Sequence, residues 1–502
     1  MERKDLNMKR SSGILMPIFS LPSPYGIGTL GKAAFDFIDF LADAGQTWWQ
    51  ILPVGPTTLW DSPYQSPSAF AGNPYFVDPD LLIEDGLLTE EEVRSYSWGK
   101  DPSRVDYDAL AENRMDLLKK AYLRGRDWHA EKIRTFEEKN ASWLPDYALF
   151  MALKKHFDHK VWMEWPDEDI RFRRPEAVER YRRELQEDIR LYSYVQYLFF
   201  RQWKHLRAYA KEKGVKIFGD LPLYVSMDSA DVWSSPENFQ LDEAHDPIEV
   251  AGVPPDYFCE EGQLWGNPLY DYDFMKRDGY GWWIRRIDGA LKLYDAIRID
   301  HFRGLESYWA VPAKETTAVN GYWKKGPGIE LLNVLNSWFG EICFVAEDLG
   351  MMTPEVEQLV ADSGLPGMRV LEFAFTAGES SSYLPHRHIP NCVCYIGTHD
   401  NDTILGWKET EPEENLAKAS AYFGLNEEEG FVWGMIRGAM SSVADLCVIQ
   451  MQDYLELGSE ARINTPGTAG GNWKWRMLPG KLSKSLAKKI CRMTEIYDRK
   501  CL

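Results

Sequence analysis

Four acidic residues stand at the ends of short apolar runs that are typical of buried parallel strands. They are Asp220, Asp300, Glu347 and Asp400. The carboxyl ends of such strands meet at one edge of a sheet or one rim of a barrel, where barrel enzymes carry their catalytic groups. A single carboxylate there is often a helix cap or half of an ion pair, but four on one rim are difficult to explain by structure alone.

Convergent carboxylates are typical of two kinds of chemistry. The first is cleavage of a glycosidic bond, in which one carboxylate attacks the sugar and a carboxylic acid donates a proton. The second is a metal site, in which Asp300, Asp400, His301 and His399 would bind Zn²⁺ or Mn²⁺. The first expected strand, residues 46–54, brings no His-x-His pair, and this weakens the metal hypothesis.

Arg298 precedes Asp300 by two positions in the run Ala-Ile-Arg-Ile-Asp. Alternation along a strand places both side chains on one face, pointing into the mouth of a barrel, while the two isoleucines face outward. Burying charges is costly unless they are paired. Two interpretations stay open: a structural ion pair, or an arginine that keeps Asp300 ionised as a nucleophile.

The elements that would position these residues alternate along the chain. Apolar runs that predict buried strands lie at residues 46–54, 215–221, 296–300, 343–347, 368–373, 393–398 and 446–450. Helical spacing predicts a helix over residues 33–44, which Gly45 ends, and Thr353 followed by Pro354 predicts a helix start. Alternating strands and helices with right-handed crossovers indicate a parallel sheet or barrel.

Two regions interrupt this alternation. Residues 87–213 are mostly charged, with long amphipathic helices expected over residues 113–124 and 181–213, and we interpret them as a helical insertion. Residues 226–272 are irregular and rich in glycine, proline and aromatic residues, which is typical of a functional loop. Both fit within one catalytic domain that spans residues 1–502, since barrels with insertions reach this length.

Composition restricts the ligand and the compartment. The net charge of −20 would repel a phosphate backbone, so we expect no nucleic acid partner. Aromatic residues make up 14% of the chain, with 20 Trp, which fits either a Trp-rich core or rings that stack on sugars. Seven cysteines without a CxxC pair, no secretory signal and no apolar stretch long enough to cross a membrane predict a cytoplasmic protein.

A set of ordered motifs resembles the 4-α-glucanotransferases called amylomaltases or disproportionating enzymes, relatives of the α-amylase clan. The resemblance covers nearly the whole chain. Its most specific segments are Gly252-Val-Pro-Pro-Asp-Tyr-Phe258, Arg298-Ile-Asp-His-Phe-Arg-Gly304, Ala346-Glu-Asp-Leu-Gly350, Thr398-His-Asp-Asn-Asp402 and Arg462-Ile-Asn-Thr-Pro-Gly-Thr468. The resemblance implies a (β/α)8 barrel with helical and loop insertions between its strands.

The resemblance also implies roles for individual residues. Asp300 would be the nucleophile, Glu347 the general acid and base, and Asp400 the carboxylate that holds hydroxyls of the glucose at the cleaved bond. The remaining residues implied to contact substrate or to orient the nucleophile are Tyr64, Asp220, Tyr257, Phe258, Trp265, Arg298, His301 and His399. The implied substrates are α-1,4-glucans and malto-oligosaccharides such as maltodextrin, starch and glycogen, with no metal ion and no organic cofactor.

Three hypotheses follow for the activity. The first is a transferase that moves glucan segments through a covalent intermediate, and the second is a retaining α-glucan hydrolase with the same carboxylates. An aromatic lid at Tyr257, Phe258 and Trp265 favours transfer, because a lid that stacks an acceptor sugar also displaces water. The third is a non-catalytic glucan-binding protein, which the intact pair Asp300 and Glu347 disfavours; a metal-dependent hydrolase is a more distant fourth.

Overall fold

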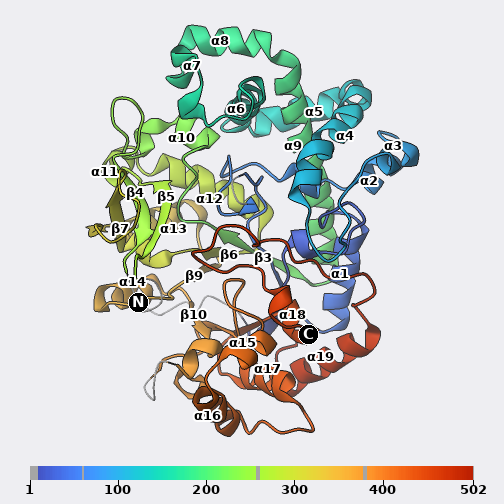
Figure 1. Cartoon of the computed structure of the whole chain (residues 1–502), viewed down its shortest axis with the longest axis vertical. Coiled ribbons are helices and arrows are strands. Elements are labelled where there is room, and N and C mark those ends of the chain that lie inside the picture. Colours follow the sequence, from blue (N-terminus) through green and yellow to red (C-terminus); the bar gives the residue numbers. More distant parts are fainter. Residues whose placement is uncertain (1–8, 59–60, 256–259, 377–380, 501–502) are drawn as a thin grey trace.

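Eight parallel strands close into a barrel in a computed structural model that describes residues 9–58, 61–255, 260–376 and 381–500. The order around the barrel is β1-β12-β11-β10-β9-β6-β3-β2. The strands are β1 (Ser11–Leu15), β2 (Trp48–Gln50), β3 (Lys216–Leu221), β6 (Ala296–Ile299), β9 (Phe344–Ala346), β10 (Gly367–Val370), β11 (Cys392–Tyr395) and β12 (Leu446–Gln450). This confirms the (β/α)8 barrel, with helices and loops inserted between its strands (Figure 1).

Strand β1 is the barrel strand that the apolar runs did not predict. Its sequence, Ser-Ser-Gly-Ile-Leu, is short of large apolar side chains although all of it is buried. The neighbouring Trp48 fills the space instead: a Cβ built on Gly13 would lie 2.7 Å from the Trp48 Cβ, and the Trp48 Nε1 donates to the Ser11 Oγ at 3.3 Å. A strand that packs against a tryptophan of its neighbour therefore has small residues and lacks the usual apolar run.

Helices connect most consecutive barrel strands. Helix α1 and helix α14 confirm the sequence prediction, and Thr353 caps α14 by accepting from the Val356 N–H. The helices outside the segment between β2 and β3 are α1 (Lys32–Asp43), α10 (Ala230–Ser234), α11 (Tyr272–Arg277), α12 (Gly281–Leu293), α13 (Gly328–Phe339), α14 (Pro354–Ser363), α15 (Ile404–Thr410), α16 (Glu413–Phe423), α17 (Phe431–Ser441), α18 (Met451–Tyr454) and α19 (Lys484–Ile496).

The regular secondary structure in the described part of the long segment between β2 and β3 is helical. It contains α2 (Pro79–Glu84), α3 (Glu90–Arg94), α4 (Tyr107–Trp128), α5 (Ala130–Lys139), α6 (Leu144–His156), α7 (Glu168–Arg171), α8 (Pro175–Glu184) and α9 (Gln186–Glu212). The helix expected over residues 181–213 is broken at Leu185, which separates α8 from α9. A buried ion pair between Lys154 and Asp228 joins α6 to the segment that follows β3.

A second sheet stands beside the barrel and has antiparallel strands in the order β5-β4-β7-β8. The strands are β4 (Glu249–Val253), β5 (Gln263–Pro268), β7 (Ser307–Pro312) and β8 (Tyr322–Lys325). Strands β4 and β5 fall in the region 226–272, where the sequence predicted irregular structure, and β7 comes from the segment after β6. The glycine and proline residues of this region are unfavourable in strands, so the sequence did not predict the sheet. Strand β4 is stabilised by pairing with β7, which lies outside residues 226–272.

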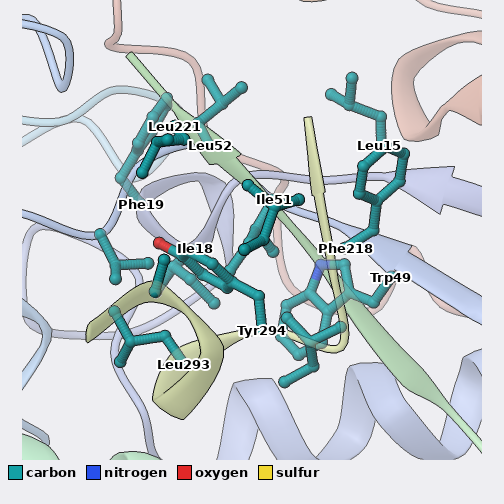
Figure 2. Packing of buried hydrophobic residues seen from close by; sticks show 14 of the residues in the cluster. Leu15, Ile18, Phe19, Trp49, Ile51, Leu52, Phe218, Leu221, Leu293 and Tyr294 are labelled. Atoms are coloured by element: carbon teal, nitrogen blue, oxygen red, sulfur yellow. The ribbon is translucent and has the colours of Figure 1, made fainter. Parts of the chain in front are cut away.

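Part of the core lies between the barrel strands and the helices around them, where Trp49 of β2 (Figure 2) packs edge-on against Phe37 of α1. Gly219 of β3 is needed there, because a Cβ at this position would lie 2.2 Å from the Tyr294 ring. Most of the tryptophans serve the core, and among the largest fully buried side chains are Trp49, Trp162, Trp165, Trp203 and Trp233. The aromatic content thus reflects packing at many positions, and the exposed and half-buried rings remain as candidates for sugar stacking.

The first and last barrel strands close the barrel. Strand β1 pairs with β12 from Ser11 opposite Leu446 to Leu15 opposite Gln450. The buried Arg499, which follows α19, donates from Nη1 to the Ser11 carbonyl at 2.9 Å and from Nη2 to the Ser442 carbonyl at 2.8 Å. No helix in the described part of the chain is long and apolar enough to cross a membrane.

Candidate active site

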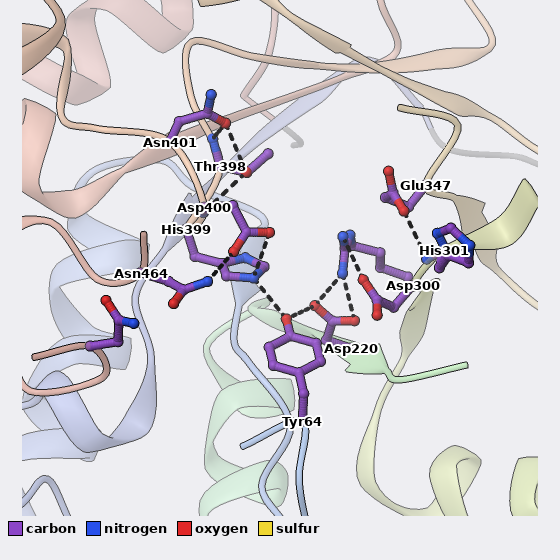
Figure 3. Close-up of polar contacts among 12 residues, drawn as sticks. Tyr64, Asp220, Asp300, His301, Glu347, Thr398, His399, Asp400, Asn401 and Asn464 are labelled. Atoms are coloured by element: carbon purple, nitrogen blue, oxygen red, sulfur yellow. Dashed lines mark hydrogen bonds and ion pairs between the residues drawn. The ribbon is translucent and has the colours of Figure 1, made fainter. Parts of the chain in front are cut away.

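Asp220, Asp300 and Glu347 lie at the carboxyl ends of the neighbouring strands β3, β6 and β9 (Figure 3). Strands β6 and β9 pair so that Ile299 lies opposite Ala346, and the next residue of each strand is a carboxylate. Parallel strands are about 4.8 Å apart. The two carboxylates therefore begin from adjacent backbone positions on one rim.

Arg298 joins two of these carboxylates. Its Nη1 donates to both oxygens of Asp220 at 2.9 and 2.7 Å, and its Nη2 lies 2.9 Å from the Asp300 Oδ1. The side chains of Arg298 and Asp220 are almost fully buried, whereas 28% of the Asp300 side chain is exposed. The ion pair expected from the spacing of Arg298 and Asp300 is present, and it leaves Asp300 accessible from the mouth of the barrel.

Burial and charge separate the proton affinities of Asp300 and Glu347. Burial raises the pKa of Asp300 to about 6, and the guanidinium of Arg298 opposes this rise. Burial raises the pKa of Glu347 to about 8; Arg298 opposes that rise, and the negative charge of Asp300 adds to it. Near neutral pH the pair thus holds one proton, and Glu347 carries it.

The backbone after β6 positions Glu347. Its Oε2 accepts from the His301 N–H at 2.7 Å and its Oε1 accepts from the Leu349 N–H at 3.0 Å. His301 adopts a left-handed conformation with φ 48°, which is uncommon for a residue other than glycine and aims its N–H at the carboxyl group. Trp265 of β5 packs edge-on against the His301 ring at 4.8 Å, and burial lowers the pKa of His301 to about 3, so this imidazole is neutral.

Tyr64 connects the carboxylates of β3 with the segment after β11. Its hydroxyl donates to the Asp220 Oδ2 at 2.8 Å and lies 2.9 Å from the His399 Nε2. The Tyr64 and His399 rings are stacked, with centroids 5.5 Å apart. Tyr64, expected to be an aromatic platform, thus also holds Asp220 through its hydroxyl group.

Asp400 is the fourth carboxylate of the site and is 37% exposed. Its Oδ2 lies 3.3 Å from the His399 Nε2, and its Oδ1 accepts from the Asn464 Nδ2 at 2.6 Å. In Figure 3 one continuous line of contacts runs from Asn464 through Asp400, His399 and Tyr64 to Asp220. The contacts of Arg298 with Asp220 and Asp300 extend this line to the carboxyl end of β6.

Two residues of this site had no role in the sequence interpretation. Asn464 lies in the segment Arg462–Thr468, which contributed to the resemblance, and it fixes the orientation of Asp400. Trp473 packs its ring 5.7 Å from Tyr64 and 6.0 Å from His399. The motif around Asn464 was the available signal; Trp473 carries none that distinguishes it from a core tryptophan.

The structure brings together most of the expected site residues, but not all. Tyr257 and Phe258 lie outside the described residues. His301 and His399 lie on different sides of Asp300 and have different neighbours, namely Trp265 for the former and Tyr64 with Asp400 for the latter. Among the residues that the structure describes, no group of three or more His, Cys, Asp or Glu side chains is placed to hold a metal ion.

This arrangement suits a reaction at an acetal carbon. It offers an ionised carboxylate at Asp300, a carboxylic acid at Glu347 on the adjacent strand, and Asp400 with hydrogen-bonding capacity nearby. Cleavage of a glycosidic bond with retention needs a nucleophilic carboxylate and an acid at close range.

Comparison with known proteins also indicates an enzyme that acts on glycosidic bonds. A family model described as "4-alpha-glucanotransferase" matches residues 16–482. The 4-alpha-glucanotransferase of Clostridium butyricum is 49% identical over 486 residues, which cover 96% of this chain and 100% of that protein. The Thermus thermophilus protein of the same name is 47% identical over 506 residues, covering 98% and 100%.

A solved structure, titled "Amylomaltase from Streptococcus agalactiae in complex with acarbose", superimposes with a TM-score of 0.96 at 41% identity. The match covers 98% of this chain and 100% of that one. The amylomaltase of Corynebacterium glutamicum, at 20% identity and a TM-score of 0.73, shares the fold. The chain belongs to the 4-alpha-glucanotransferase family of enzymes.

Proposed function

We propose that this enzyme moves segments of α-1,4-glucans from a donor to the 4-hydroxyl of an acceptor glucan or of glucose. Asp300 is the nucleophile, Glu347 is the general acid and base, and Asp400 holds hydroxyls of the glucose at the cleaved bond. The donors and acceptors are malto-oligosaccharides and longer chains such as those of starch and glycogen. The reaction needs neither a metal ion nor an organic cofactor.

One observation carries this proposal: Asp300 and Glu347 occupy adjacent positions at the ends of paired strands, with their proton affinities separated. Retaining enzymes place their two carboxyl groups about 5–5.5 Å apart, whereas inverting enzymes need room for a water molecule and place them farther apart. Neighbouring strands are about 4.8 Å apart, so the backbones of Asp300 and Glu347 start close enough for the shorter of these two separations.

The first half of the reaction forms a covalent intermediate. Asp300 attacks the anomeric carbon of an α-1,4-linked glucose, and Glu347 gives its proton to the departing 4-oxygen, so the glycosidic bond breaks as the bond to Asp300 forms. Arg298 keeps Asp300 ionised for this attack. Asp400, which Asn464 and His399 orient, strengthens its hydroxyl contacts as the ring flattens toward the oxocarbenium ion.

The second half releases the sugar to an acceptor. Once Asp300 is esterified its negative charge is gone, so the pKa of Glu347 falls and its carboxylate can take the proton of the incoming 4-hydroxyl. The acceptor oxygen then displaces Asp300, and two inversions give net retention.

The acceptor side of the cleft stays a prediction. Trp265 lies on β5 and packs on His301, next to the nucleophile, which supports a role close to the bond that is formed. We assign stacking of the acceptor to Trp265 together with Tyr257 and Phe258. We also propose that residues 1–502 form a single catalytic domain in which residues 87–213 are a helical insertion and residues 226–272 carry this lid.

Incubation with maltotriose tests the proposed activity, with the Asp300→Asn variant as the control. We expect glucose together with a ladder of oligosaccharides longer than maltotriose. Glucose and maltose that rise together without longer products would instead establish the retaining hydrolase. Glucan binding without any product would establish a non-catalytic binding protein.

A further inference from the structure

A groove on the outer surface of the barrel is lined by exposed and half-buried aromatic rings. Its aromatic residues are Phe70, Trp143, Phe200, Trp338 and Phe339, and we call it the aromatic groove. It lies between the turn that joins α5 to α6, helix α9, helix α12 and the end of α13. Its volume is about 230 Å³, below the roughly 300–1,000 Å³ of sites that enclose a drug-sized ligand.

Trp338 is the most unusual residue of this groove. It is the penultimate residue of α13 and 66% of it is exposed, although most of the tryptophans of this chain serve the core. Beside it, Phe70 and Trp143 stack with an interplanar angle of 13°, and Trp143 also contacts Phe200. Gly289 of α12 makes room for this stack, because a Cβ there would lie 3.2 Å from the Phe70 ring.

Polar groups line the edges of the same groove. They include the hydroxyl of Ser142 and the guanidinium of Arg285. The amide of Asn140 also lines the groove, but it donates to the Phe136 carbonyl at 2.8 Å and accepts from the Trp143 Nε1 at 3.1 Å. The two other charged groups, Asp288 and Lys292, form an ion pair with each other at 2.7 Å. The groove therefore offers ring faces and hydrogen-bonding groups without the strong field that would select a charged ligand.

We propose that the aromatic groove binds a segment of an α-glucan chain, at a site separate from the active site. A glucose unit has apolar faces that stack on aromatic rings and hydroxyl groups that need hydrogen-bond partners, and it carries no charge. The small volume suits a short segment whose ends continue into solvent. The inference rests on the proposed function, because a polymeric substrate is long enough to occupy both sites at once.

Such a second site would raise the apparent affinity for long chains alone. A polymer held at the groove presents its other segments to the active site at a high effective concentration, whereas a trisaccharide is too short to connect the two sites. A smaller cavity of about 60 Å³, lined by Tyr64 and Asp220, shares Phe70 and Gly289 with the groove. Changes at Phe70 or Gly289 would therefore disturb the catalytic residues as well, and Trp338 is the better position to test.

The test compares Trp338→Ala with Trp128→Ala in the full chain. Trp128 is a matched control, since it is 67% exposed at the end of α4 and does not line the groove. Migration is measured in native gels with and without amylopectin, and KM and kcat are measured with amylose and with maltotriose. For Trp338→Ala we expect less retardation by amylopectin and a KM for amylose about fivefold higher, which corresponds to about 1 kcal/mol, with unchanged kinetics on maltotriose.

Three outcomes would overturn the inference. One is a Trp338→Ala variant that is indistinguishable from the wild type on amylopectin and amylose, and another is an equal effect in the Trp128→Ala control. The third is a wild-type dimer that Trp338→Ala converts to a monomer in light scattering, because the groove would then be an interface between copies. If the wild-type enzyme extends no maltotriose, the proposed function is refuted instead. Retardation of the wild-type enzyme by amylopectin in the native gel would still measure glucan binding at the groove.

Discussion

Two groups of carboxylates occupy the same end of the barrel. The group at β3, β6 and β9 consists of Asp220, Asp300 and Glu347, and the group that follows β10, β11 and β12 consists of Glu372, Asp402 and Asp453. In the first group Arg298 contacts two carboxylates at 2.9 Å or less. In the second group the nearest arginine contact is long, 3.9 Å from the Arg462 Nη1 to the Asp402 Oδ2.

Two members of the second group, Glu372 and Asp453, are buried without a cation in ion-pair contact among the described residues. The Glu372 Oε1 and the Asp453 Oδ2 have no hydrogen-bond partner among the described residues. Burial raises the pKa of Glu372 well above its usual value and that of Asp453 to about 7. The position of a carboxylate at the barrel rim therefore does not by itself make it catalytic. A buried arginine stabilises the ionised form that can act as a nucleophile, whereas burial without a nearby cation favours the protonated form.

The sharpest way to test this contrast is to remove the proposed nucleophile and acid. We expect Asp300→Asn and Glu347→Gln each to lower the rate of glucose release from maltotriose by about 10²-fold or more. The fold should persist, as circular dichroism would verify. Near wild-type turnover in either variant would refute its assignment.

Removing the cation of the first group should affect both stability and activity. Arg298→Met leaves Asp220 and Asp300 without their shared guanidinium, and breaking a buried pair in this way costs about 3–5 kcal/mol. Urea unfolding would measure this loss. The pKa of Asp300 should also rise, which moves the acid limb of kcat/KM to higher pH.

Arg298→Lys is the matched control for this variant. It keeps the charge but loses the planar fork that reaches both carboxylates, so we expect it to recover stability more than activity. If Arg298→Met unfolds at the same urea concentration as the wild type, the contrast between the two groups has no energetic basis.

The activity should have a bell-shaped dependence on pH. The active form needs Asp300 ionised and Glu347 protonated, so kcat/KM should rise through about pH 6 and fall above about pH 8. Since Asp300 and Glu347 interact, the two limbs of the pH profile report the apparent pKa values of the pair as a unit. Initial rates with maltotriose between pH 4 and pH 10 would measure both limbs, and a rate that still rises above pH 9 would contradict the role of Glu347 as acid.

The smallest expected effect on activity belongs to a change in the second group, Asp453→Asn, which should instead raise the stability of the protein. Asp453→Asn keeps an oxygen for the Ile404 N–H, which now donates to the Asp453 Oδ1 at 2.9 Å, and removes a group that is costly to ionise. The folded pKa of Asp453 lies above the unfolded value, so the wild type loses stability as pH rises from about 4 toward 7. The free energy of unfolding of the variant should therefore exceed that of the wild type increasingly across this pH range. The difference is about 1.4 kcal/mol for each unit by which folding raises the pKa of Asp453.

Thermal unfolding at pH 4.5 and pH 8 would measure this difference. The second group is linked to the active site through the segment 398–402 and through Arg462, which donates to the Asp400 carbonyl at 2.7 Å. Asp453→Asn changes neither link, so maltotriose kinetics should change little. A variant less stable than the wild type at pH 8 would show that the ionised form of Asp453 has a stabilising partner.

The sequence predicted the barrel strands whose own side chains build the core. The run at residues 215–221 is strand β3, and the alternation in Ala296–Asp300 correctly placed Arg298 beside Asp300. Strand β1 was not predicted because its own side chains are small and Trp48 of the next strand provides the packing. The antiparallel sheet was not predicted because β4 pairs with β7, which lies far from it in the sequence.

The site was predictable where a residue contacts the reacting atoms, and less so where it supports another side chain. The carboxylates of β3, β6 and β9 could be identified because charge in an apolar run requires an explanation. Asn464 could not, since a polar residue in a loop has no such requirement; its importance depends on the contact with Asp400. Glu372 lies within the predicted run at residues 368–373 and could have been identified in the same way, whereas the burial of Asp453 became evident only in the folded chain.

The pairing of β1 with β12 also has a consequence for the order in which the protein assembles. Synthesis proceeds from the N-terminus at about 5–20 residues per second, so β1 is made long before the strand at residues 446–450 that covers its second edge. Until then the growing sheet has open edges, which can pair with other chains. Asp300 and Glu347 are both present at that stage, at the ends of the paired strands β6 and β9, but the closed barrel that holds these two strands is not. A chain that ends before residue 446 would therefore be left with an open sheet, with the catalytic carboxylates in place and no closed rim to hold them.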